Sequence, residues 1–342
     1  EFRRVLFRSK LWLVMFLVAV LDLLFLVYVL GPKVERPSFD KILPVIDIPL
    51  EEIDAYIEEK EASLPVKEGN ESRIIWADSS RTKTPVSVVY LHGWSASAVE
   101  GDPIHRQIAQ DLGANLYLPR LAEHGLSKEE ALLEITADDL VDSAKEALSI
   151  AQLIGDRVVI VATSNGGALA LYLAESISDL AALILYSPNI EIYDPTAKLL
   201  DDPWGLEIAK KVKGSNYHIA NMPDSRKPYW YHRYRLESLP QLQAFISRAM
   251  TPTNFKTVDE PVFLGYYYKN EEEQDKVVSV PAMLRMYDQL STPSSQKQKQ
   301  AFPKAGDHIL ASPLASNDVE GVYRATYSFL KEVANLEIKT PQ

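Results

Sequence analysis

Within Arg157–Leu173, a strand, a tight turn of small residues and a helix follow one another, and this segment constrains the fold more than any other. The run Val158–Val161 is apolar and β-branched, which is typical of a buried strand. The turn Ala162–Gly166 is made of small and polar residues, and Gly167 leads into a helical pattern. The order predicts a strand, then one sharp turn that carries Ser164, and then a helix.

A serine in such a turn is typical of a nucleophile elbow, whose usual pattern is G-x-S-x-G. Here Ala162 replaces the first glycine. The serine of an elbow has a strained backbone, so small neighbours such as Gly166 and Gly167 are needed where strand and helix approach each other. The helix N-terminus also offers free N–H groups to an oxyanion. On this motif alone, an ordinary strand-to-helix turn with an incidental serine stays open.

The composition is that of an ordinary globular protein, with 342 residues, 46% of them hydrophobic and 24% charged. This length suits one large domain or two small ones. The chain has no cysteine, which excludes disulfides and a cysteine nucleophile. A net charge of −11 argues against nucleic-acid binding. His218 and His232 have no partner at metal-ligand spacing, so we expect no metal.

Residues 11–30 are apolar except for Asp22, and a helix of that length spans roughly 30 Å, the thickness of a bilayer core. A cleaved signal peptide is the alternative, but the stretch is long for one and residues 28–32 make a poor cleavage site. We therefore expect a single-pass membrane anchor. Basic residues precede it, which favours an extracytoplasmic catalytic domain: Arg3, Arg4, Arg8 and Lys10. Residues 1–10 are interpreted either as a cytoplasmic tail or as non-native sequence.

Strands alternate with helices from Val86 to Tyr186, which predicts right-handed βαβ units and a mostly parallel sheet flanked by helices. The alternation includes single helices over Ala98–Leu112 and Thr136–Ile154. It lapses after Ser187 in a segment rich in proline and aromatics, too long for a plain loop, which we interpret as a helical cap. Within it, Tyr229–Arg235 is interpreted as the packing face of a cap helix in preference to a pocket wall. The resulting division is 31–71 linker and amphipathic helix, 72–188 first part of the core, 189–260 cap, and 261–342 second part of the core.

A second feature that hydrolysis needs follows the strand Val86–Leu91, where the chain continues as His92-Gly93-Trp94. The glycine allows a tight loop, and the N–H after it can point at a developing negative charge. We interpret His92, and likewise His124 in a later loop, as structural.

A serine is a weak nucleophile and needs an adjacent base. His308 is the best candidate, because it follows the last expected strand at the same sheet edge as Ser164. Asp275 follows the preceding strand and could hold the imidazole in the right tautomer. Glu272 and Glu273 remain rivals for that role. The chain order Ser, Asp, His is the order found in α/β-hydrolases.

These residues and their surroundings resemble the α/β-hydrolase-fold serine hydrolases, in the branch of the monoacylglycerol lipases and serine aminopeptidase-like hydrolases. The likeness runs from about residue 72 to residue 334 and rests on YLHGWSAS, ANLYLPRLAEHG, VATSNGG, DKVVS and GDHILAS. It implies an α/β-hydrolase fold with an inserted cap, and Ser164, Asp275 and His308 as catalytic residues. It also implies an oxyanion hole made by the N–H groups of Trp94 and Asn165.

The expected reaction is hydrolysis of carboxylic esters of lipid-like or small acyl substrates through an acyl-enzyme on Ser164, without cofactor or metal. Amide, peptide or thioester cleavage and acyl transfer by the same residues stay open, because the shape of the cap sets the substrate. A non-catalytic binding protein on this fold is the third possibility. Expected partners are the small-molecule ester and the membrane, not nucleic acid.

Overall fold

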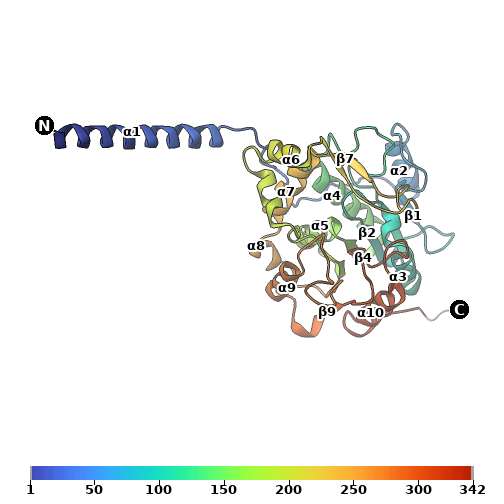
Figure 1. Cartoon of the computed structure of the whole chain (residues 1–342). Helices are drawn as coiled ribbons and strands as arrows, with labels where there is room; N and C mark the ends of the chain where they lie inside the picture. Colours follow the sequence, from blue (N-terminus) through green and yellow to red (C-terminus); the bar gives the residue numbers. More distant parts are fainter. Residues whose placement is uncertain (1, 340–342) are drawn as a thin grey trace.

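The computed structural model describes residues 2–339, with side chains from residue 12 onward. The first helix, α1 (Phe2–Val29), extends away from the folded body (Figure 1). Its segment Trp12–Val29 is long and apolar enough to cross a membrane, and none of it is buried against the body. A signal sequence would satisfy the same criteria of length and composition.

A seven-stranded sheet forms the centre of the body, with strand order β1-β3-β2-β4-β5-β8-β9. Every neighbouring pair is parallel except β1 with β3, which is antiparallel. The expected α/β-hydrolase architecture is therefore confirmed. The strands are β1 (Arg73–Ile75), β2 (Thr84–Leu91), β3 (Asn115–Leu118), β4 (Gly155–Thr163), β5 (Leu180–Tyr186), β8 (Val262–Tyr266) and β9 (Lys297–Ala301).

Helices cover both faces of this sheet, which explains the continuous apolar runs in its central strands, such as 158–162 in β4 and 180–186 in β5. Residues of β4 such as Val159 and Ile160 are completely buried, one toward each face. Each buried side chain of this size contributes about 1.5–3 kcal/mol relative to an exposed one. One face carries α3 (Ile104–Leu112) and α10 (Val319–Glu332); the other carries α2 (Ile53–Glu61), α4 (Ala137–Ile154), α5 (Asn165–Leu173), α7 (Ser238–Ala249) and α9 (Val280–Gln289). Short 3-10 helices join some of these elements: η1 (Leu50–Glu52), η3 (Ala174–Ser176) and η5 (Ser294–Gln296).

The helix expected over 98–112 is in fact two helices. A 3-10 helix, η2 (Ala98–Gly101), is followed by an extended residue, Asp102, and then by α3. Pro103 causes the break, because the ring of a proline disfavours the helical conformation in the residue before it. The interruption turns Glu100 toward the sheet, where it is almost completely buried.

The cap between β5 and β8 is mixed rather than purely helical. It contains a two-stranded antiparallel pair, and Tyr229–Arg235 forms a turn and a strand, so its assignment to a helix was wrong. The aromatic residues of this segment favour strand over helix, and Tyr234 stacks on His218 of the opposite strand with ring centroids 4.9 Å apart. The elements are η4 (Pro195–Asp201), α6 (Gly205–Lys213), β6 (Tyr217–Ile219), β7 (Arg233–Arg235), α7 and α8 (Pro252–Phe255).

Candidate active site

Ser164 lies between the end of β4 and the start of α5, with φ 54° and ψ −118°. A positive φ is costly for a residue with a Cβ, so the surrounding structure must hold it in place. Two backbone hydrogen bonds do so: Ser164 N–H donates to Tyr186 O (2.9 Å), and Asn189 N–H donates to Ser164 O (2.8 Å). The close approach of α5 to β2 also requires a glycine at position 166, because a Cβ on Gly166 would lie 2.0 Å from the carbonyl oxygen of Leu91.

Asp275 and His308 meet in space although 32 residues separate them in the chain. His308 Nδ1 lies 2.6 Å from Asp275 Oδ2, so the ring donates to the carboxylate. The other oxygen, Oδ1, accepts the N–H groups of Val277 (2.8 Å) and Val278 (3.1 Å), which fixes the plane of the carboxylate. The rivals Glu272 and Glu273 are exposed, and Glu273 pairs with Lys269 instead.

The environment of His308 prepares it to take a proton. Burial alone would lower its pKa, but the charge of Asp275 and the hydrogen bond to it raise the pKa above its ordinary value, helped by the charges of Glu100 and Asp307. Its side chain is 9% exposed, and Nε2 has no hydrogen-bond partner among residues 2–339. That nitrogen is therefore available as a base, and His308 lines the same cavity as Ser164.

His92 orients the peptide that carries the N–H of Trp94. Its Nδ1 donates to the carbonyl oxygen of Gly93 (2.9 Å), and its Nε2 accepts the N–H of Leu121 (3.1 Å). Because a trans peptide is planar, holding the Gly93 carbonyl toward the ring directs the Trp94 N–H the opposite way. Burial lowers the pKa of His92 to about 4, so the ring stays neutral and keeps both bonds.

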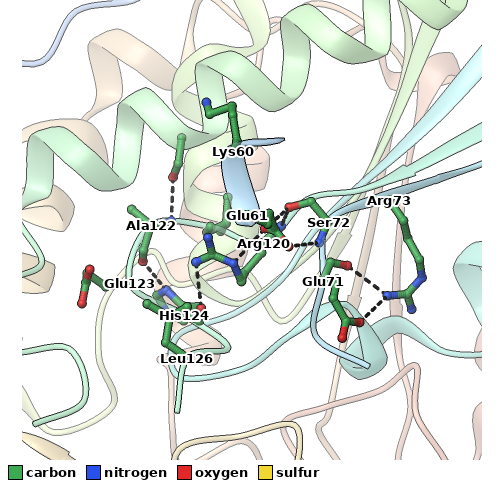
Figure 2. A network of polar contacts seen from close by, with 12 residues as sticks. Lys60, Glu61, Glu71, Ser72, Arg73, Arg120, Ala122, Glu123, His124 and Leu126 are labelled. Atoms are coloured by element: carbon green, nitrogen blue, oxygen red, sulfur yellow. Dashed lines mark hydrogen bonds and ion pairs between the residues drawn. The ribbon is translucent and has the colours of Figure 1, made fainter. Parts of the chain in front are cut away.

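A polar network supports the loop that contacts His92 (Figure 2). Arg120 Nε donates to Glu61 Oε1 (2.9 Å), and its Nη1 donates to the carbonyl of His124 (3.1 Å). Ser72 donates to the same glutamate through its N–H (2.9 Å) and hydroxyl (2.8 Å). The His124 ring donates to Ala122 O (2.7 Å), which gives this histidine a structural bond. The network thus joins α2 and β1 to the loop that contacts His92.

A cavity of about 810 Å³ opens beside these groups, with Trp94, Ser164 and His308 in its wall. Most of the remaining wall belongs to the cap and is apolar: Leu199, Leu200, Ile208, Ala209, Val212, Met222, Trp230, Tyr234, Leu236, Leu239 and Leu242. Two members of the segment Tyr229–Arg235, Trp230 and Tyr234, thus do form a pocket wall. Asn165 follows Ser164 as the first residue of α5, where its N–H has no intrahelical partner.

Residues 88–325 match the profile of the Alpha/beta hydrolase family, which is more than half of the chain. The chain belongs to the alpha/beta hydrolase family. The family expected from the sequence motifs is thereby confirmed. This hydrolase is 29% identical over 189 residues to a thermostable monoacylglycerol lipase of Bacillus sp. (strain H-257), covering 55% of this chain and 71% of that protein.

Solved structures share the fold of the hydrolase. A structure from work on LipS and LipT, two metagenome-derived lipolytic enzymes, has a TM-score of 0.61 at 17% identity, covering 78% of this chain and 99% of the other. The monoacylglycerol lipase of Paleococcus ferrophilus has a TM-score of 0.54 at 15% identity, covering 76% and 97%. The relatives of this hydrolase are thus lipases and esterases.

The sequence did not single out one further polar group in the wall of the hydrolase's cavity, Glu100. It lies within the continuous helix expected over 98–112, and no motif marked it. The signal that could have found it is Pro103, which predicts that the helix is interrupted just after this glutamate.

Proposed function

We propose that this hydrolase cleaves carboxylic esters of lipid-like substrates through an acyl-enzyme on Ser164. The observation that carries the proposal is the Asp275–His308 pair: His308 lines one cavity with Ser164, and its Nε2 has no hydrogen-bond partner within the described part of the chain. In this mechanism the hydroxyl oxygen of Ser164 attacks the ester carbonyl carbon while His308 Nε2 takes the hydroxyl proton. His308 then gives this proton to the departing alcohol, which leaves the acyl group bound to Ser164. In the second half, His308 takes a proton from water, the water oxygen attacks the acyl group, and His308 returns the proton to Ser164 as the acid is released.

The N–H groups of Trp94 and Asn165 are proposed to stabilise the oxyanion of each tetrahedral intermediate. The Trp94 N–H belongs to a peptide whose carbonyl is held by His92. The Asn165 N–H lies at the N-terminus of α5, where the helix dipole favours negative charge. Two such donors stabilise the transition state most when the site excludes water.

A lipid-like substrate is supported by the apolar cap wall and by the kind of relatives found. The position of α1 adds to this argument. The indole N–H of Trp204, just before α6, donates to Val27 O near the end of α1 (3.0 Å). In Figure 1, α6 lies on the side of the body from which α1 extends. If α1 anchors the protein, α6 therefore faces the membrane.

The membrane-facing helix α6 carries apolar side chains that are both exposed and part of the cavity. Ile208 is 49% exposed and Val212 is 79% exposed. Both also line a groove of about 430 Å³ against Tyr28 of α1 and Trp204. Exposed apolar groups at this place are suited to contact the bilayer. We therefore propose that α1 is a single-pass anchor and that the ester enters from the lipid phase. The basic residues before the span favour an extracytoplasmic body.

Hydrolysis of esters with short, medium and long acyl chains by wild type and Ser164→Ala tests the reaction. We expect the variant to lose about 10⁴-fold or more in kcat, because the nucleophile is absent. A matched control is Ser294→Ala, which removes a hydroxyl from an exposed surface turn. Equal rates in wild type and Ser164→Ala would exclude the proposed nucleophile. Parallel amide and thioester series decide between ester hydrolysis and the other uses of the same residues.

A further inference from the structure

Glu100 is a buried carboxyl group in the active-site wall that the proposed mechanism does not use. It lies in η2 and is only 2% exposed. Its Oε2 accepts the N–H of Gly93 at 2.6 Å and lies 3.1 Å from the hydroxyl of Tyr90. The same hydroxyl is 2.8 Å from Oγ1 of Thr163, the residue before Ser164. The carboxyl group thus joins the loop before Trp94 to the strand that carries the nucleophile.

Glu100 is also close to the reacting groups. A Cβ on Gly93 would lie 2.8 Å from Glu100 Oε1 and 3.0 Å from the Cβ of Ser164, so the two side chains approach the same point in space. Glu100 lines the cavity together with Ser164 and His308. A carboxyl group at this place acts electrostatically on whatever charge develops there, because the surroundings are largely apolar.

The bond to Gly93 complements the bond that His92 makes. Glu100 holds the N–H of Gly93, and His92 holds its carbonyl, so both peptide groups of this glycine are fixed. The second peptide group is the one that contains the Trp94 N–H. Fixing both of them restricts the direction of that N–H, and an oxyanion donor must be aimed before the reaction to be effective.

We propose that Glu100 is a positioning residue of the active site: it fixes the loop that presents the Trp94 N–H, and it acts electrostatically on His308 across the cavity wall that the two side chains share. The inference rests on the proposed function for its catalytic meaning. Its electrostatic part concerns the ground state and is measurable without turnover.

The charged groups around Glu100 and His308 determine how a substitution at Glu100 would change the pKa of His308. Asp275, Glu100 and Asp307 act on His308, and Asp307 is paired with Arg226 of the cap (2.8 Å). Burial raises the pKa of Glu100 to about 7, against the lowering effects of the Gly93 N–H, the charge of His308, the Tyr90 hydroxyl and the Trp230 indole. At pH values at which Glu100 is ionised, removing its charge should lower the pKa of His308, because one of the charges that raise that pKa is lost.

Two substitutions separate the roles. Glu100→Gln keeps an acceptor oxygen for Gly93 and removes the charge. We expect the imidazole resonances of His308, followed by NMR in the full chain, to titrate at lower pH than in wild type. The acid limb of kcat/KM for a short soluble ester should shift in the same direction, and the plateau of kcat should fall less in Glu100→Gln than in Glu100→Ala, because the acceptor for the Gly93 N–H is kept. Glu100→Ala removes the acceptor too, and should lower kcat by about tenfold or more with KM unchanged, as a misaligned oxyanion donor would.

The NMR titration keeps this inference distinct from the proposed function. If Ser164→Ala does not reduce turnover, the proposed function fails, but the lowered pKa of His308 in Glu100→Gln still tests the electrostatic contact. If Glu100→Ala does not fold, the titration and the pH profile of Glu100→Gln decide alone. A His308 titration and a pH profile identical to those of wild type in Glu100→Gln would overturn the inference, as would a wild-type kcat in a folded Glu100→Ala.

Discussion

At the scale of single residues, the proposed role of His308 as a base depends on its contact with Asp275. Asp275→Asn keeps an oxygen for the N–H groups of Val277 and Val278 but loses the negative charge that holds the ring and stabilises the imidazolium. We expect kcat for a short ester to fall by about 10⁴-fold, with the fold unchanged by circular dichroism. The matched control is Glu272→Gln on the exposed loop, which should keep wild-type kcat. Equal losses in both variants would contradict the assignment of Asp275.

At the scale of elements, the packing of α5 against β2 depends on the absence of one side chain. A Cβ at Gly166 would lie 2.0 Å from the carbonyl oxygen of Leu91, which neither backbone can accommodate without moving. We expect Gly166→Ala to lower the free energy of unfolding by about 3 kcal/mol or more, measured by urea denaturation. Gly214→Ala is the control: its φ is +62°, but open space surrounds the position, so the cost should be only about 1–2 kcal/mol. A Gly166 variant no less stable than the control would show that the helix can shift freely.

At the scale of the whole molecule, the relation between α1 and α6 predicts how substrate form affects rate. Val212→Asp places a charge on the exposed apolar face of α6. We expect the rate of hydrolysis of a long-chain ester embedded in vesicles to fall by about tenfold or more. A tenfold loss corresponds to about 1.5 kcal/mol of lost apolar contact with the membrane. The rate for a short soluble ester should stay the same. The control is Val45→Asp, which changes a side chain that is 90% exposed and is not in the cavity wall. Parallel losses on both substrates would point to damage of the cavity rather than of membrane contact.

Local patterns predicted the parts of the site that are local in the chain. Buried parallel strands carry continuous apolar runs, so Val158–Val161 was recognisable and with it the position of Ser164. The proximity of Asp275 to His308 followed from the order of the strands in this fold. The sequence favoured Asp275 over Glu272 only through its place before the next helix and the family resemblance, because burial, which distinguishes the two carboxylates, depends on the folded structure. The pairing of β6 with β7 could not be predicted from the sequence either, because it joins two segments that only the folded cap brings together.

The cap begins after β5 and ends before β8, and these two strands are hydrogen-bonded neighbours in the sheet. The two ends of the cap therefore lie close together, at neighbouring strands of the sheet that forms the scaffold. Most of the apolar wall comes from the insert, whereas Ser164, Asp275 and His308 belong to the scaffold. Exchange of this one segment, in evolution or by laboratory grafting, would thus change the range of accepted molecules and leave the three proposed catalytic residues in place.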